Sequence, residues 1–407
     1  MNEKQPTYIS SFFLVFLWIF LHKFIVVVVR QHLYKAGEWT EISQHCDVSI
    51  SFQLVLVFGN INELKNPLIH EQIRVLYPVA DIVVASTSGE IIRDQVIDNC
   101  VVATAVSFST TKIRSISKKV CDYSSVFQLG NELFNDLNAA NPDLAGIFLV
   151  SDGHLVNGSE LVDGLNKANV NNLPITGGLA GDSALFSNTL TGLNGMPNEG
   201  NVIGVGFYGK HFLIGHEQWG GWDEFGRERI ITRSENNVLY EIDGQSALGL
   251  YKEYLGVYAD KLPGSGLLFP LSILIENKKE KMVRTILGIN EDENSMTFAG
   301  NMPVGSKVRL MKASFDKLIE GVYNASSVSV AQINNNQPQL CIVISCLGRK
   351  LILKERVVEE VEAACAQLGR DVTITGFYSN GEICPIAAGA PCELLNQTVT
   401  ISSFCEL

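Results

Sequence analysis

The sequence lacks most of the patterns that mark a familiar catalytic or redox site. It has no Walker A lysine, no G-x-S-x-G elbow and no H-E-x-x-H pair, and its nine cysteines include no C-x-x-C pair. An odd number of cysteines scattered through apolar segments is typical of reduced thiols, so we expect a cytoplasmic protein. These absences make a role without catalysis the first expectation.

Positive charge is also scarce. The 407 residues carry 31 lysines and arginines against 43 acids, which gives a net charge of −12. Because nucleic-acid domains usually present a basic stripe, we expect no nucleic-acid partner. With 46% apolar residues the composition is globular, and the length predicts two or three domains.

A long uninterrupted apolar run is missing at the N-terminus. The run that begins at Phe12 breaks at His22 and Lys23. A bilayer span needs about 20 consecutive apolar residues. We therefore interpret residues 1–23 as an apolar extension, with membrane anchoring through residues 9–29 as the alternative.

Three stretches of the chain share one order of features, which is strand, helix, strand and a turn of glycine and an acid. The paired strands are predicted at residues 54–58 and 82–85, 146–150 and 174–177, and 340–345 and 372–376. Counting from the isoleucine of each second strand, the acid follows eight residues on at Glu90, seven at Asp182 and eight at Glu382. Continuous apolar strands joined through helices are typical of parallel pairs buried on both faces. We predict a mixed α/β fold of mainly parallel sheets, built from three βαβ-type units with antiparallel extensions.

The glycine-acid turns are the predicted ligand sites. Ligands of parallel sheets collect at the carboxyl ends of strands, where helix N-termini and free N–H groups face outward. Glycine lets the backbone approach a ligand, and hydroxyls and carboxylates supply hydrogen bonds. The alternative is that each acid only accepts N–H bonds from its own turn. The candidates are Ser86, Thr87, Ser88, Gly89, Glu90, Ser151, Asp152, Gly177, Gly178, Gly181, Asp182, Cys346, Arg349, Ser379, Gly381 and Glu382.

Two of these candidates occupy strand-to-helix corners. Asp152 is expected to cap the N-terminus of the following helix. Cys346 precedes Arg349, and a thiol beside an arginine and a helix N-terminus could have a lowered pKa. This is the basis of an enzymatic alternative, in which Cys346 is the nucleophile or two carboxylates act as acid and base. In the ligand-binding interpretation, Arg349 pairs a ligand carboxylate and one acid pairs an amine.

Two other patterns predict no site. The segment Gly204-Val-Gly-Phe-Tyr-Gly209 matches G-x-G-x-x-G, but it lies in a strand-like run and opens no helix, so we expect no dinucleotide there. His211 and His216 are five residues apart and would point to opposite faces of a strand, so we expect no metal site.

Several segments together resemble one protein family. They are Gly177-Gly-Leu-Ala-Gly-Asp182, Trp222-x-x-Phe225-Gly226, Tyr240-Glu-Ile-Asp-Gly244, Gly376-Phe-Tyr-Ser-Asn-Gly-Glu-Ile383 and Asn396-Gln-Thr398. In this order, over roughly residues 50 to 404, the chain resembles the FIST sensory proteins. The resemblance implies a FIST N-type domain at 25–244 and a FIST C-type domain at 245–407, two closely packed domains. The chain departs from the family at Ala85-Ser86 and at Cys392-Glu393.

The resemblance also implies a function. FIST proteins are bacterial-type, intracellular input modules of signal transduction, proposed to bind small ligands such as amino acids and to act on a separate partner such as a histidine kinase. The resemblance adds Gly376, Tyr378 and Asn396 to the candidate ligand-binding residues. A haem-based nitric oxide sensor is the alternative, although none of His154, His211 and His216 can be aligned with an axial haem position. We therefore predict a ligand-binding sensor with neither a metal nor a required cofactor.

Overall fold

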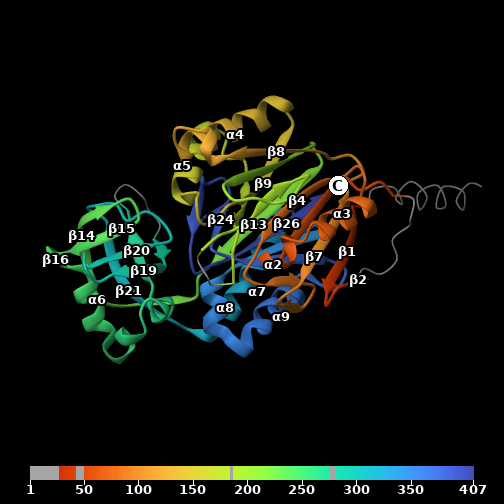
Figure 1. Cartoon of the computed structure of the whole chain (residues 1–407). Helices are drawn as coiled ribbons and strands as arrows, with labels where there is room; N and C mark the ends of the chain where they lie inside the picture. Colours follow the sequence, from red (N-terminus) through yellow and green to blue (C-terminus); the bar gives the residue numbers. More distant parts are fainter. Residues whose placement is uncertain (1–26, 43–49, 184–186, 276–280) are drawn as a thin grey trace, which may run out of the picture.

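The structure is a computed structural model that describes residues 27–42, 50–183, 187–275 and 281–407 (Figure 1). The predicted extension 1–23 and most of the anchor segment 9–29 lie outside these residues. Among the described residues, no helix is both long and apolar enough to cross a bilayer.

Three six-stranded sheets form the larger part of the molecule. The first, in the order β11-β4-β3-β7-β1-β2, consists of β1 (Val28–Lys35), β2 (Glu38–Glu41), β3 (Leu54–Gly59), β4 (Asp81–Ser86), β7 (Val101–Ser107) and β11 (Thr191–Leu193). The second, β25-β24-β10-β9-β12-β8, consists of β8 (Lys112–Lys119), β9 (Leu144–Ser151), β10 (Ile175–Leu179), β12 (Asn201–Tyr208), β24 (Gly381–Pro385) and β25 (Cys392–Leu395). The third, β13-β26-β22-β23-β5-β6, consists of β5 (Glu90–Ile92), β6 (Gln95–Ile97), β13 (Phe212–Trp219), β22 (Leu340–Cys346), β23 (Thr373–Ser379) and β26 (Val399–Glu406).

One pair of neighbouring strands in each of these sheets is parallel and connected through helices. The pairs are β3 with β4, β9 with β10, and β22 with β23, which lie at the strand pairs that we predicted from the sequence. Every other strand pairing within the described residues is antiparallel. The mixed α/β class is confirmed, whereas the expectation of mainly parallel sheets is wrong, because antiparallel strands flank each parallel pair on both sides.

The three sheets exchange strands. Beside β4 lies β11, beside β10 lies the hairpin β24–β25, and beside β23 lies the hairpin β5–β6. In each case the added strand comes from a different part of the chain and joins the second strand of the parallel pair. The second and third sheets thereby combine strands from both sides of the predicted boundary at residues 244 and 245.

The inner faces of all three sheets meet in one core, to which Phe58, Phe148 and Phe377 contribute. Apolar residues also fill the outer faces, because helices cover them. The helices are α2 (Ile61–Leu64) and α3 (Pro67–Leu76) on the first sheet, α4 (Val126–Ala140) and α5 (Gly158–Ala168) on the second, and α7 (Phe315–Gln332) and α9 (Val357–Leu368) on the third, with α8 (Leu347–Leu353) after β22 (Figure 1).

Residues 222–313 form a separate sheet, which we call the inserted module. It has eight strands, β14 (Trp222–Glu235), β15 (Val238–Ile242), β16 (Gln245–Ser246), β17 (Leu271–Leu274), β18 (Met282–Arg284), β19 (Ile286–Asn290), β20 (Ser295–Phe298) and β21 (Lys307–Ala313), packed against α6 (Ala247–Leu255). Figure 1 shows the module as a curled body beside the three-sheet core. The chain enters it after Gly221 and leaves it at Ser314, whose N–H donates to Gly221 O (3.3 Å).

Candidate functional site

The three glycine-acid turns predicted from the sequence meet at one place. We call them the first turn (residues 86–90), the second turn (residues 178–182) and the third turn (residues 378–382). Each follows the second strand of a parallel pair and leads toward a strand of another sheet. The strand exchange therefore brings the three turns together.

Backbone hydrogen bonds join the turns directly. The N–H of Gly181 donates to Ser86 O (2.8 Å), which joins the second turn to the first. The N–H of Ser88 donates to Tyr378 O (2.9 Å), which joins the first turn to the third. The hydroxyl of Ser86 also donates to Gly181 O (2.8 Å), and the N–H of Tyr378 donates to Gly89 O (2.9 Å). The predicted residues thus form one buried cluster rather than three separate sites.

Glu90 is buried and held within the first turn. The hydroxyl of Thr87 donates to its Oε1 (2.5 Å), and the thiol of Cys100 donates to its Oε2 (3.2 Å). Burial raises the pKa of Glu90 to about 7, because the charged carboxylate loses its water, and these two hydrogen bonds offset only part of the effect.

Glu382 repeats this arrangement in the third turn. The hydroxyl of Ser379, three residues before it, donates to Oε1 (2.6 Å). Oε2 accepts from both the N–H (3.2 Å) and the hydroxyl (2.8 Å) of Thr398. Burial raises the pKa of Glu382 to about 8. The segments Thr87-Ser-Gly-Glu90 and Ser379-Asn-Gly-Glu382 therefore share one hydrogen bond, from the hydroxyl of the first residue to the carboxyl of the fourth.

Asp182 differs from the two glutamates because it accepts hydrogen bonds from the loop that follows it. Its Oδ2 accepts from the N–H groups of Ser187 (2.7 Å) and Asn188 (3.3 Å). Asp182 thus accepts backbone N–H bonds, as the structural alternative expected, but from the following loop rather than from its own turn.

Asp152 does not cap a helix, contrary to our expectation. The cap of α5 is Asn157, whose side chain accepts from two N–H groups of the first turn of the helix. Asp152 instead accepts from the N–H groups of His154 (2.8 Å), Leu155 (2.6 Å) and Gly200 (2.9 Å). The carboxylate of Asp152 therefore stabilises the bend between β9 and α5 and is not available to the helix, which begins later.

The predicted glycines of the strands contact protein rather than a ligand. A Cβ on Gly177 would lie 1.9 Å from Leu149 O, and one on Gly376 would lie 1.8 Å from Val343 O. Each glycine therefore lets a strand lie close to its parallel neighbour. A Cβ on Gly178 would instead lie 3.0 Å from Cγ2 of Ile344, a side chain of β22 in the third sheet. The other predicted members of the cluster, which are also buried, are Ser151, Gly89 and Gly381.

Arg349 is not available to a ligand carboxylate. It is fully buried, and its Nε (2.7 Å) and Nη2 (2.6 Å) contact Glu360 Oε1. Nη1 donates to the carbonyls of Trp219 and Gly220, and Nη2 donates to Leu318 O (2.9 Å). Because these contacts use all five donors, the predicted pairing with a ligand is wrong.

Glu360, which the sequence analysis missed, connects Arg349 to the cluster. Its Oε2 accepts from the hydroxyls of Ser345 (2.9 Å) and Tyr378 (2.9 Å). Lys350 was also missed, and its ammonium donates to Ser88 O (2.7 Å) and pairs with Asp98. The sequence signal that could have identified Lys350 was the basic pair Arg349-Lys350 at the start of a helix that follows a parallel strand.

The thiol of Cys346 does not have the lowered pKa that a nucleophile requires. Cys346 is buried, and burial together with the nearby charge of Glu382 raises the pKa of its thiol. The enzymatic alternative loses its proposed nucleophile.

The loop of residues 394–398 completes the cluster. Glu382 pairs with Leu395 across β24 and β25, which places Asn396 beside Gly381. Asn396 and Gln397 are fully buried, and neither Asn396 Oδ1 nor Gln397 Oε1 has a hydrogen-bond partner. Buried acceptors without a protein donor are usually satisfied by an ordered water molecule or by a ligand.

The histidines form no cluster in this region. His154 and His211 are exposed, whereas His216 is buried beside Cys384 Sγ (3.9 Å), and burial lowers its pKa to about 4. The part of the chain that the structure describes holds no group of three histidine, cysteine or acidic side chains placed to bind a metal ion.

Two cavities lie away from the three turns. One, of about 880 Å³, is lined by β1, the β5–β6 turn, the end of α9 and the start of β23. It includes the side chains of Arg93, Glu362 and Cys365. The other lies in the inserted module and is described below.

Comparison with known proteins places this arrangement in a family. Residues 53–245 match the FIST N domain, and residues 247–385 match the FIST C domain. The chain belongs to the FIST family. FIST domains are sensory domains of signal transduction.

Other comparisons add little to the FIST assignment. A search among curated proteins finds no match. Among solved structures, a chorismatase resembles this FIST protein with a TM-score of 0.38 and 10% sequence identity, over 93% of this chain and 98% of the chorismatase. At that level the likeness carries no argument about fold or function.

Proposed function

We propose that this FIST protein senses a small ligand rich in N–H donors, an amino acid or a similar metabolite. The ligand would bind between the third turn and the loop of residues 394–398, which would have to separate, because Thr398 bonds Glu382 directly across this contact. A separate output protein, such as a histidine kinase, would respond to the bound state. The observation that carries the proposal is the set of buried, unpartnered oxygens in that loop.

These oxygens are all hydrogen-bond acceptors. Asn396 Oδ1 and Gln397 Oε1 lie in the loop, Asn380 Oδ1 lies in the third turn, and none of the three has a donor. Glu382, between them in the hairpin, adds a carboxylate. A buried acceptor without a donor costs roughly 1–3 kcal/mol, so a ligand that supplies several N–H groups is favoured. The ammonium group of an amino acid supplies three.

The outer side of the same loop contacts the inserted module. The indole N–H of Trp222 donates to Gln397 O (2.8 Å), and Gln397 Nε2 donates to Leu267 O (3.3 Å). The buried guanidinium of Arg284 donates to Leu394 O (3.1 Å). A ligand that moves this loop would therefore move the contacts that hold the module.

A second connection runs through Arg349. Its guanidinium bonds Gly220, where the chain enters the module, and Leu318, in the helix after the chain leaves it. Glu360 joins Arg349 to the hydroxyl of Tyr378 in the third turn. Displacement of the third turn would thus reach both connections of the module. This supports the module as the element whose position reports the ligand.

The first experiment is calorimetric titration of the purified protein with the proteinogenic amino acids and with the amines that lack their carboxyl groups. We expect saturable binding of at least one amino acid and retention of binding by its amine. Glu382→Gln should weaken binding by about tenfold or more, which corresponds to about 1.4 kcal/mol, because the ammonium loses the carboxyl group whose ionisation its own charge favours.

The controls separate this site from the first turn and from the surface. Glu90→Gln changes the equivalent carboxyl of the first turn, and Glu320→Gln changes an exposed acid on α7. Both variants should bind the ligand like the wild type. Equal loss of affinity in Glu90→Gln and Glu382→Gln, or no binding by any amino acid or amine, would contradict the proposal.

A further inference from the structure

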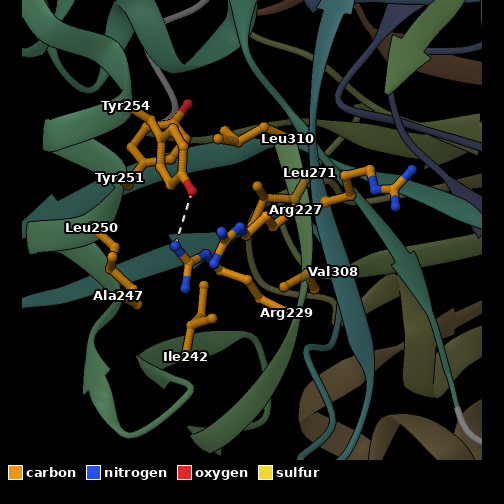
Figure 2. A pocket seen from close by; sticks show the side chains of 11 residues that line it. Arg227, Arg229, Ile242, Ala247, Leu250, Tyr251, Tyr254, Leu271, Val308 and Leu310 are labelled. Atoms are coloured by element: carbon orange, nitrogen blue, oxygen red, sulfur yellow. Dashed lines mark hydrogen bonds between the residues drawn. The ribbon is translucent and has the colours of Figure 1, made fainter. Parts of the chain in front are cut away.

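The inserted module contains a cavity of about 30 Å³ that opens to solvent. It lies between α6 and strands β14, β15, β17 and β21 (Figure 2). None of its lining residues belongs to the three turns or to the loop of residues 394–398. The lining consists of Arg227, Arg229, Ile242, Ala247, Leu250, Tyr251, Tyr254, Leu271, Val308, Arg309 and Leu310.

The floor of this cavity is apolar. Ala247 and Tyr251, one turn apart on α6, are buried against the strands, and so are Ile242, Leu271 and Val308. The hydroxyl of Tyr251 is used up by Phe269 O (2.7 Å), so it offers no donor to the cavity. The floor can therefore accept a small hydrocarbon group but not a polar one.

The rim of the cavity carries three arginines. Arg229 pairs with Asp243 (3.0 Å), and its Nη2 donates to the hydroxyl of Tyr254 (2.9 Å), the hydrogen bond drawn in Figure 2. Arg309 pairs with Glu224 (3.2 Å), which also binds Lys281. The buried Nε atoms of Arg229 and Arg309 have no hydrogen-bond partner.

Arg227 is the unpaired charge of this rim. It is exposed, and within the described residues it has neither a hydrogen bond nor an ion pair. Counting Lys281 and Lys307, five cations stand against three carboxylates, which are those of Glu224, Glu228 and Asp243. The local excess is positive, in a chain whose net charge is −12. An anion is the ligand that this excess favours.

The backbone around Arg227 is shaped by a bulge. Phe225 pairs with Leu310 and Arg229 pairs with Val308, so residues 226–228 of β14 lie opposite the single residue between them on β21. Gly226 allows this with a φ of +74°, a conformation that side chains with a Cβ rarely adopt. Bulges of this kind re-aim side chains and are frequent beside functional sites.

We propose that this cavity binds a small carboxylate with a short branched hydrocarbon group. Only the end of the hydrocarbon, about the size of a methyl group, enters the cavity, where it lies on the floor formed by Ile242, Leu271 and Val308. The carboxylate accepts two parallel N–H bonds from the guanidinium of Arg227. This site does not depend on the proposed amine site at Glu382, because the two have opposite charge and lie in different sheets.

The test uses isovalerate as the probe, with isoamylamine and isoamyl alcohol as matched ligands that lack the negative charge. Titration calorimetry of the full chain should give saturable binding of isovalerate and at least tenfold weaker binding of both other compounds. Arg227→Gln should weaken isovalerate binding by about tenfold. Leu250→Trp, on the half-buried edge of α6, should block the opening and abolish binding.

Two control variants make the outcome specific. Arg233→Gln removes another arginine of β14, one that lies over the ring of Tyr240 at 4.6 Å, and it should bind isovalerate like the wild type. Glu382→Gln should also bind isovalerate like the wild type, even if this variant no longer binds amines. Wild-type protein that gives no heat with isovalerate, or an Arg227→Gln variant with unchanged affinity, would overturn the proposal.

Discussion

The first and third turns are built alike around their glutamates but differ in what surrounds them. In both, a hydroxyl three residues earlier donates to the carboxyl, at 2.5 Å for Glu90 and 2.6 Å for Glu382. The second oxygen of Glu90 accepts a hydrogen bond from the thiol of Cys100. That of Glu382 is bound by Thr398, in a loop with unpartnered oxygens that contacts the module. The same pattern of a hydroxyl residue followed two and three positions later by glycine and glutamate therefore serves a structural turn in one place and the proposed ligand site in the other.

The cations beside the two turns differ in how deeply their ion pairs are buried. Lys350, at the first turn, pairs with Asp98, whose side chain is 61% exposed. Arg349, behind the third turn, and its partner Glu360 are both fully buried. Two consecutive residues of α8 thus make one surface ion pair and one buried pair, and only the buried pair reaches the connections of the module.

Breaking the buried pair should have the largest effect. Arg349→Met leaves the carboxylate of Glu360 without its cation, which we expect to lower the free energy of unfolding by about 3–5 kcal/mol. Lys350→Met should cost about 1 kcal/mol or less, because its partner is in water. Urea denaturation of both variants measures the difference.

The double variant Arg349→Met, Glu360→Leu checks the cause of that loss. Removing both charges should restore part of the stability, since no unpaired charge stays buried. Equal losses in Arg349→Met and Lys350→Met would mean that the buried pair has no special place in the fold.

The pH dependence of stability should separate the two glutamates. Each has a folded pKa raised from 4.5, to about 7 for Glu90 and about 8 for Glu382. Below pH 4.5 both states of the protein hold these protons, and the contribution of the protonated glutamates is fully present. As the pH rises, the unfolded chain ionises first, so stability falls by about 1.4 kcal/mol per pH unit for each group until its folded pKa is passed.

Glu90→Gln should remove the part of this slope that ends near pH 7, and Glu382→Gln the part that ends near pH 8. Between pH 7 and pH 8 only Glu382 still contributes to the pH dependence of stability, so this range distinguishes the two glutamates. Denaturant unfolding at pH 5, 6, 7 and 8 measures it. If the free energy of unfolding of Glu90→Gln and that of Glu382→Gln are equally independent of pH between 7 and 8, the two carboxyls do not differ as described.

Much of this site followed from local sequence. The strand pairs were predictable because their apolar runs are buried on both faces, and the three acids were predictable from their spacing after these strands. The rule that the carboxyl ends of parallel strands hold the functional loops identified each turn, whereas their meeting at one place depends on the exchange of strands between the sheets.

The partners across the fold were not predictable. The short strands β5, β11 and β24 each join another sheet, and three to five residues carry too little pattern to specify a distant partner. Arg349 looked free because its contacts lie 11, 31 and 129 residues away, at Glu360, Leu318 and Gly220. No periodicity relates such positions, so the sequence could identify the arginine but not that the protein already uses it.

Removing the hydroxyl donors should give a smaller loss of stability than breaking the buried pair, and it is the most direct test of the comparison. Thr87→Val and Ser379→Ala each leave a buried glutamate one hydrogen bond short, which we expect to cost roughly 1–2 kcal/mol in both turns. Their effects on the rest of the molecule should differ. Thr87→Val should change only the first turn, because Glu90 keeps its bond from Cys100 and contacts no part of the module.

Ser379→Ala should also loosen Glu382 from the loop that holds the module. Backbone amides of residues 394–398 and 220–222 should then exchange faster with deuterium, and the amine ligand should bind more weakly. Hydrogen exchange followed by mass spectrometry measures these segments in both variants. Faster exchange at 220–222 in Thr87→Val, or none in Ser379→Ala, would show that the two turns influence the module equally and that the loop is not the connection.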